Sequence, residues 1–265
     1  MPPKNERLRL PAQIIRFSFL IAALVLAAWT TVSRAQSPTE NTYYARRNTL
    51  GILGAYSWDS SHILLGSAEN RMLVSIGAVY NRRLLLNHIV NWQYSGELLP
   101  VALESDPVQV TVTTYTSLVF PNDVFTETMS NPTGLGCHSS SGNGTIQGFA
   151  SYTFVATCTR RWTMGEAMSP VGFQWNFLPH RKMQPFVVGH GGYMYSTQPI
   201  PLTTAGSFNF TFDIGAGLEL YHSKSRSIRA EYRYHHISNA STAQLNPGID
   251  NGLLQVTYSF GFGRQ

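Results

Sequence analysis

One stretch of the chain alternates in polarity at every residue, and this pattern constrains the fold more than any other feature. Along Phe208–Leu220, apolar residues such as Phe210 alternate with polar or small residues such as Asn209. Successive side chains of a β-strand point to opposite faces, whereas a helix would spread these residues around its whole circumference. The stretch is therefore predicted to be a strand with one apolar face and one polar face.

Seven further segments show the same period of two, in some cases less cleanly. They are Leu50–Trp58, Met72–Tyr80, Leu84–Tyr94, Val171–Phe177, Phe186–Tyr195, Ile228–Ser238 and Leu254–Phe262. The connections between the candidate strands alternate between short and long, as they do in outer-membrane barrels. Asn81–Arg83, Pro179–Lys182 and His222–Ser227 are the short ones, and residues 59–70, 97–168, 197–206 and 239–249 are the long ones.

We therefore expect an all-β fold: an antiparallel up-and-down transmembrane β-barrel of eight strands with a long extracellular insertion. Only 12% of the residues are charged. Beyond the N-terminal region, no apolar stretch approaches the roughly 18 residues of a membrane-spanning helix. If this chain lies in a membrane, it must do so as a barrel, in which neighbouring strands satisfy the polar backbone groups.

A soluble β-barrel or sandwich is the alternative fold. In that fold the apolar faces of the strands would form a core and the polar faces would meet water. The apolar faces carry many large aromatic side chains, whereas the opposite faces carry small and polar ones. This combination favours a narrow barrel with a polar interior.

The insertion over residues 105–165 fits the barrel pattern least well. It is either an extracellular cap or an extra pair of hairpins, since Val108–Phe120 and Ile146–Ala156 could themselves be strands, which leaves ten strands open. Its two cysteines, Cys137 and Cys158, lie 21 residues apart. An exported chain favours a disulfide between them, and the lack of nearby ligands at metal-binding spacing argues against a metal site.

The first 35 residues have the three parts of a secretory signal. Basic residues precede an apolar stretch over Phe17–Ala28, and Ser33-Arg34-Ala35 follows as a cleavage site. We expect a signal peptide over residues 1–35 and a single domain over residues 36–265. A retained N-terminal membrane anchor is the alternative, and it would also place the chain outside the cytoplasm.

The charge of the chain is concentrated in that leading segment. It holds five of the 19 Lys and Arg residues and one of the 14 acidic residues, which leaves 14 basic against 13 acidic residues. The remainder is nearly neutral, so the composition does not indicate a nucleic-acid partner.

A histidine and a serine two residues apart end one of the expected strands. His236 and Ser238 project from one face, and that face is apolar because it includes Ile228 and Tyr232. Polar groups are costly on a face toward lipid unless they bond to each other or serve a function. An imidazole beside a hydroxyl is the basic requirement for nucleophilic acyl transfer.

A carboxylate is also needed to hold the imidazole in the correct tautomer. Asp250 lies twelve residues after Ser238, at the start of the next expected strand, and shares the parity of Leu254. An antiparallel hairpin would bring it beside His236. The sequence therefore predicts a catalytic triad of His236, Ser238 and Asp250 on the lipid-facing side of the barrel.

These residues resemble the active-site hairpin of a known family, the lipid A 3-O-deacylases, which are also called acyloxyacyl hydrolases. The resemblance is carried by His236-Ile237-Ser238-Asn239-Ala240 and Asn246-Pro247-Gly248-Ile249-Asp250. It is strong over about residues 170–262 and loose over residues 105–165. The family has a Glu twelve residues after its Ser, so Asp250, which is one methylene shorter, departs from the pattern.

The resemblance implies an eight-stranded outer-membrane barrel that removes an ester-linked 3-hydroxyacyl chain from lipid A of lipopolysaccharide in the outer leaflet. It implies an acyl-Ser238 intermediate and no metal or organic cofactor. Asn246, Asn239 and the backbone near Gly248 are the implied donors to the oxyanion. Asn246-Pro247-Gly248 would also serve as turn residues in any hairpin.

Two other functions remain open at this stage: a non-catalytic structural or adhesion barrel, and a soluble secreted esterase. A homodimer is compatible with the sequence but is not indicated by it. Four scattered histidines, for which we expect structural or solvated roles, are His88, His180, His190 and His222. Arg229, Glu231 and Arg233 share the inward face of their strand and are expected to form an ion-pair ladder in the lumen.

Overall fold

The computed structural model of the protein describes residues 43–58, 63–120 and 123–263. The expected signal peptide over residues 1–35 lies outside this range. Within it, no helix is long and apolar enough to span a membrane.

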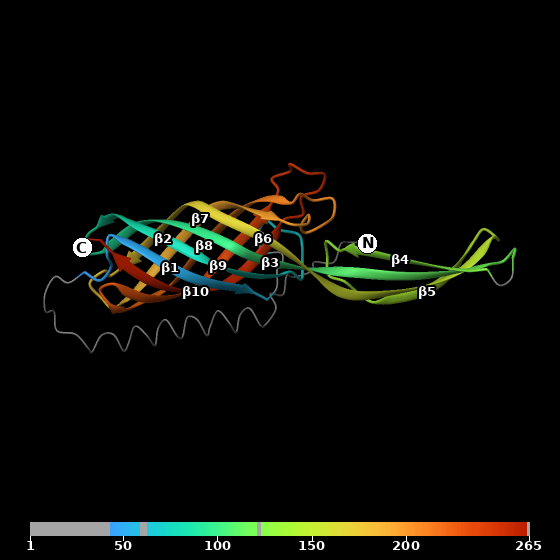
Figure 1. Ribbon diagram of the computed structural model, residues 1–265, viewed down its shortest axis with the longest axis horizontal. Coiled ribbons are helices and arrows are strands. Elements are labelled where there is room, and N and C mark those ends of the chain that lie inside the picture. Colours follow the sequence, from blue (N-terminus) through green and yellow to red (C-terminus); the bar gives the residue numbers. More distant parts are fainter. Residues whose placement is uncertain (1–42, 59–62, 121–122, 264–265) are drawn as a thin grey trace, which may run out of the picture. The chain divides into compact units, whose positions relative to one another are not determined.

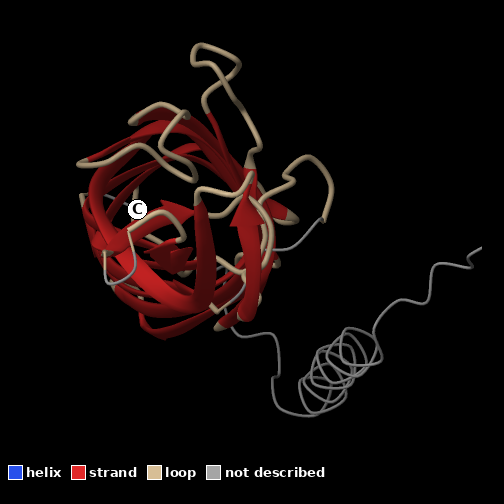
Figure 2. Ribbon diagram, turned by 90° about the vertical axis from the view of Figure 1, so that its right-hand side faces the viewer, coloured by secondary structure: helices blue, strands red, loops and turns tan. Residues whose placement is uncertain are grey.

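The described chain forms a single antiparallel sheet of ten strands. The strands are β1 (Asn48–Ser57), β2 (Met72–Leu86), β3 (Val90–Ser117), β4 (Val124–Pro132), β5 (Ser140–Ile146), β6 (Ala150–Phe177), β7 (Met183–Ser196), β8 (Phe208–Ser223), β9 (Arg226–Ser238) and β10 (Ile249–Phe262). Pairing of β3 with β6 closes eight of them into a ring, while β4 and β5 lie outside it. Figure 2 shows this ring end-on. The predicted all-β barrel is thus confirmed.

Residues 105–165 form the pair of hairpins rather than an irregular cap. β3 and β6 each have 28 residues, and they stay paired beyond the barrel as far as Ser117 and Ala150. β4 pairs with the outer part of β3 and β5 with the outer part of β6, which gives a four-stranded extension (Figure 1). Cys137 and Cys158 are joined by a disulfide.

The barrel is polar inside and apolar outside. Along β10, Leu254 and Val256 are exposed, whereas Gln255 and Thr257 are buried. The soluble alternative required the apolar faces to form a core, and the structure has the opposite arrangement. An apolar exterior around a polar interior is the arrangement of a membrane-spanning barrel.

One predicted boundary is wrong. Asn81–Arg83 does not form a turn but lies within β2, which continues to Leu86. The turn falls at Asn87, whose side-chain Oδ1 accepts hydrogen bonds from the amides of Ile89 and Val90, both at 2.8 Å. This side-chain bonding of an Asn to the backbone ahead of it stabilises a tight turn.

Candidate active site

The register of the β9–β10 hairpin pairs His236 directly with Asp250. His236 Nδ1 lies 2.7 Å from Asp250 Oδ1. The next pair along the hairpin, Ile237 with Ile249, is buried in an apolar cluster on the inner side. Slipping the register by one residue would expose these isoleucines, so packing on one face fixes the contact on the other.

Ser238 is the last residue of β9 and shares the outward face with His236. The imidazole is 14% exposed, and the serine is partly buried. On the neighbouring strand β8, Phe210 pairs with Ser238 and Phe212 pairs with His236. Both phenylalanines are exposed. The hydroxyl and the imidazole therefore open onto an aromatic, apolar surface.

Asp250 is fully buried, although its strand position is outward. Its Oδ2 accepts hydrogen bonds from the amides of Leu64 and Leu65 at 2.7 and 2.9 Å. Its Oδ1 accepts the hydroxyl of Tyr234 at 2.8 Å. An ionised carboxylate can only accept, so His236 Nδ1 must be the donor, which leaves Nε2 as the atom that can take a proton.

The segment that covers Asp250, residues 64–68, is called the strap here. It is anchored to the chain that precedes Asp250: Ser67 N donates to Pro247 O at 2.6 Å, and Ala68 N donates to Gly248 O at 3.0 Å. The strap precedes β2 and is more than 180 residues away from Asp250 in sequence. It binds Oδ2 of the carboxylate, whereas His236 contacts Oδ1.

Two glycines allow these close contacts. A Cβ on Gly66 would lie 2.6 Å from Asp250 N and 2.9 Å from Asp250 Oδ1. Gly248 has φ +62°, and a Cβ there would lie 3.0 Å from His236 Cε1. The strap thus reaches the short Asp side chain because residue 66 has no side chain of its own.

Ser238 does not face His236 in this structure. Its hydroxyl donates to Asn246 Oδ1 at 3.1 Å, and it accepts from Ala240 N at 3.1 Å. In the part of the chain that the structure describes, no hydrogen bond joins Ser238 to His236. Nucleophile and base contacts are often long or misaligned before substrate binds, so rotation of the hydroxyl would be needed.

The orientation of the Asn246 amide follows from its second contact. Asn246 Oδ1 also accepts from the backbone amide of Asn239 at 3.1 Å. A backbone amide can only donate, so the oxygen must face it. Asn246 Nδ2 is then left beside Ser238 with no partner among the described residues.

Asn239 has a different role from Asn246. Its Nδ2 donates to Leu245 O at 2.7 Å, and its Oδ1 accepts from Ser241 N at 2.9 Å. The side chain is buried and ties the two ends of the loop together. Its amide is thus committed to the loop, and Asn246 is the better placed donor for an oxyanion.

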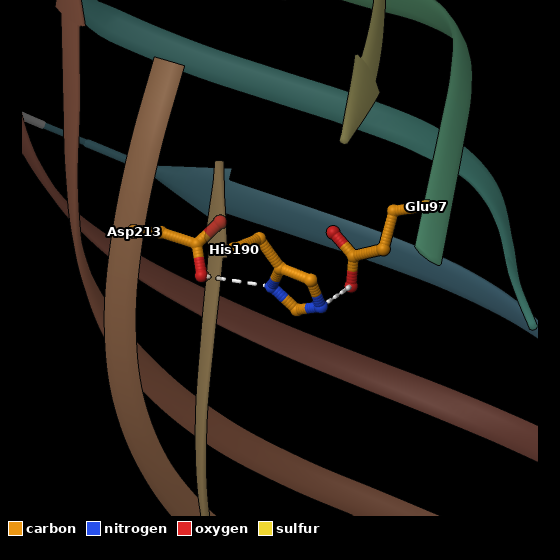
Figure 3. Close-up of side chains that lie close together, drawn as sticks. All are labelled: Glu97, His190 and Asp213. Atoms are coloured by element: carbon orange, nitrogen blue, oxygen red, sulfur yellow. Dashed lines mark hydrogen bonds and ion pairs between the residues drawn. The ribbon is translucent and has the colours of Figure 1, made fainter. Parts of the chain in front are cut away.

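A second cluster of titratable groups lies inside the barrel. Figure 3 shows His190 between Glu97 and Asp213, whose potential ligand atoms all lie within 4.8 Å of one another. The guanidinium of Arg233 lies in this cluster. Its Nη2 is 2.8 Å from Glu97 Oε1, and its Nη1 is 3.3 Å from Asp213 Oδ1. Arg233 also pairs with Glu231 at 3.1 Å. The guanidinium supplies the charge that a metal ion would bring, so the cluster is an internal ion network.

In the same cluster, Ser95, His190 and Asp213 form a second set of Ser–His–Asp hydrogen-bond contacts. His190 Nε2 is 3.0 Å from Ser95 Oγ, and His190 Nδ1 is 3.0 Å from Asp213 Oδ1. Ser95 is fully buried in the lumen. It is therefore a competing candidate by geometry, but an acyl chain in the surrounding lipid cannot reach it.

Sequence reasoning missed the roles of Tyr234 and the strap. Strand parity places Tyr234 on the outward face, but nothing in the sequence indicates that its hydroxyl binds Asp250. The run Ile63-Leu64-Leu65-Gly66 carries no polar side chain that would mark it as part of a site. It acts through backbone amides, and these leave no signal in the sequence beyond the glycine.

Comparisons with known proteins agree with the predicted family. The family model of the lipid A 3-O-deacylases (PagL) matches residues 111–259. No curated protein matches the chain.

Solved structures with similar folds include the outer membrane enzyme PagL, with a TM-score of 0.42 and 13% identity over 81% of this chain and 99% of that one. Neisserial surface protein A has a TM-score of 0.39 and 11% identity over 82% and 99% of the two chains. LpxR from Salmonella typhimurium has a TM-score of 0.24 and 8% identity over 81% and 100%. These likenesses are distant, and the family model alone supports membership.

The matched region spans 149 of the 265 residues and includes His236, Ser238 and Asp250. The chain belongs to the lipid A 3-O-deacylase (PagL) family.

Proposed function

We propose that this protein is an outer-membrane ester hydrolase that removes an ester-linked 3-hydroxyacyl chain from lipid A. Ser238 is the nucleophile, His236 the general base and Asp250 the group that orients it. The observation that carries the proposal is the direct pairing of His236 with Asp250 at 2.7 Å, with Ser238 two residues along the same outward face.

In the first step, Ser238 Oγ attacks the ester carbonyl carbon while its proton moves to His236 Nε2. The tetrahedral intermediate carries its negative charge on the former carbonyl oxygen, where Asn246 Nδ2 is the donor we assign. The C–O bond to the sugar then breaks, and His236 returns the proton to the departing sugar oxygen. The products are the 3-O-deacylated lipid and an acyl-Ser238.

In the second step, water attacks the acyl-Ser238 carbonyl and His236 takes the proton from the water. Collapse of the second tetrahedral intermediate breaks the bond to Ser238 Oγ, which recovers its proton from His236. A 3-hydroxy fatty acid is released. Neither a metal or organic cofactor nor a second subunit is needed for either step.

The apolar outward face suits a lipid substrate that stays in the membrane while it is cleaved. Phe210 and Phe212 flank the two catalytic groups, and the strand faces below them are apolar. An acyl chain of a lipid in the outer leaflet can lie along this surface with its ester at Ser238. We also propose that residues 1–35 are a cleaved export signal and that residues 36–265 form one barrel domain.

Mass spectrometry of lipid A after incubation with the purified protein tests the proposal. The wild type should remove the mass of one 3-hydroxy fatty acid, and Ser238→Ala should leave the lipid A intact. Two matched serine variants act as controls: Ser241→Ala in the same loop and Ser95→Ala in the lumen should cleave like the wild type. Undiminished cleavage by Ser238→Ala, or its loss in Ser95→Ala, would show that the outward triad is not the catalytic site.

A further inference from the structure

The short-turn end of the barrel carries a concentration of positive charge that ester hydrolysis does not use. Eight cationic residues lie in the turns and strand ends here: Arg46, Arg47, Arg82, Arg83, Arg181, Lys182, Lys224 and Arg226. We call them the basic collar. They come from four separate parts of the chain, which the barrel brings to one end.

Carboxylates do not balance the basic collar. Along the described strands, the acidic residue nearest this end is Glu219, which is 4% exposed. Glu219 accepts hydrogen bonds from Asn176 Nδ2 and Ser227 Oγ, both at 2.5 Å, inside the lumen. The outer surface of this end therefore presents positive charge with no internal partner of opposite sign in the described range.

The opposite end of the barrel differs. Its arginines in the described range are Arg71, Arg160 and Arg161, and all three are engaged within the protein. Arg71 is buried against Asp106 at 3.2 Å, and Arg161 pairs with the same carboxylate at 2.7 Å. Arg160 binds Asn70. Of these three arginines only Arg160 lacks a carboxylate partner among the described residues, whereas all eight cations of the basic collar lack one.

Two members of the basic collar share the outward face with apolar side chains. Arg226 on β9 pairs with Phe260 on β10, which pairs with Leu50 on β1. Two residues further toward the end, Phe262 pairs with Asn48, which pairs with Arg82 on β2. Arg82 and Arg226 are exposed, and so are the three apolar residues between them. The adjacent strands β9, β10, β1 and β2 thus form an outward surface about 15 Å wide. Aromatic and aliphatic side chains occupy its middle, and Arg226 and Arg82 lie at its two edges.

We propose that this surface binds anionic phospholipids of the leaflet at the short-turn end, with the lipid phosphate between Arg82 and Arg226 and an acyl chain against Phe260 and Leu50. Long cationic side chains at the edge of an apolar membrane belt extend their charged ends to the headgroups. Each Lys or Arg near an anionic membrane surface contributes to attraction that acts over about a Debye length. A soluble phosphate would not use the apolar side chains between the cations.

The inference requires the barrel to span a membrane, but it does not depend on ester hydrolysis. Native mass spectrometry of the full folded protein in detergent tests it, with phosphatidylglycerol and phosphatidylcholine as probes of equal acyl length. The wild type should retain phosphatidylglycerol in preference to phosphatidylcholine. Arg82→Gln and Arg226→Gln should each weaken phosphatidylglycerol binding by about fivefold, and the pair by about 25-fold.

Arg160→Gln is the matched control, since it removes one exposed charge at the other end of the barrel. It should bind phosphatidylglycerol like the wild type, and glycerol phosphate should not displace the lipid. Heat-modifiable gel mobility shows whether each variant is folded, and lipid A cleavage by the two collar variants should be unchanged. Equal retention of the two lipids by the wild type, or equal loss in Arg160→Gln and Arg82→Gln, would overturn the proposal.

Discussion

Asp250 Oδ1 lies 2.7 Å from His236 Nδ1, across a hairpin in which the two residues are direct partners. The other oxygen of the same carboxylate is held by two amides of the strap. The acid is therefore oriented by two other parts of the chain, β9 and the strap, before any substrate arrives. Preorganisation of this kind makes the site sensitive to changes that leave the barrel intact.

Replacing Asp250 by Asn should lower turnover by about 10⁴-fold. The strap amides of Leu64 and Leu65 can only donate, so they should select the amide oxygen of the new side chain. Its NH₂ group would then face His236 Nδ1 and force the proton onto Nε2, the tautomer that cannot accept from Ser238. A time course of lipid A cleavage measures the change. Turnover within tenfold of the wild type would mean that Asp250 does not orient His236.

Gly66→Ala tests the strap. The new Cβ would lie 2.6 Å from Asp250 N, so the strap or the start of β10 must move. A displacement of about 1 Å at a catalytic group costs roughly 100-fold in rate. Gly54→Ala is a suitable control, because no atom lies within 4 Å of its added Cβ. Both variants should keep heat-modifiable mobility, and only Gly66→Ala should lose activity. Full activity in Gly66→Ala would show that the strap is not part of the site.

Local patterns in the sequence were enough to predict the barrel and the hairpin that pairs His236 with Asp250. Period-two alternation is a local property, and the parity of His236, Ser238 and Asp250 follows from it directly. The turn at Asn87 was missed because Leu84 to Leu86 have no alternation that distinguishes a strand end from its middle. The extension could be predicted only in part. Val108–Phe120 overlaps the outer part of β3, whereas Ile146–Ala156 runs across the turn between β5 and β6. Outer β3 carries threonine on both faces, which weakens its alternation of polarity.

The contacts that complete the site could not be predicted for a different reason. The strap reaches Asp250 from 185 residues away through backbone amides, and any sequence supplies backbone amides. Its position depends on the backbone hydrogen bonds of Ser67 and Ala68 to Pro247 and Gly248. Gly66 is the strap residue whose type reflects the contact with Asp250, but a single glycine is common in loops that make no such contact.

Arg233→Met should destabilise the barrel by about 3–5 kcal/mol, because it would leave Glu97, Asp213 and Glu231 as buried carboxylates without their shared cation. Arg226→Met on the same strand is the control, since Arg226 is exposed and forms no ion pair among the described residues. The midpoint of urea unfolding in detergent, followed by heat-modifiable mobility, measures the effect. Equal midpoints for the two variants would show that the luminal ion network contributes little to stability.

The role of Asn246 can be resolved by two substitutions that differ in one property. Asn246→Asp keeps an oxygen that can accept from Ser238 and from the Asn239 amide, but it removes the NH₂ donor. Asn246→Ala removes both. If Nδ2 stabilises the oxyanion, both variants should lose about 100- to 1,000-fold in kcat with little change in KM. If Asn246 only positions the serine and the loop, Asn246→Asp should keep most of the activity while Asn246→Ala loses it. We expect both variants to lose activity, because Asn246 Nδ2 lies beside Ser238 and donates to no other group among the described residues.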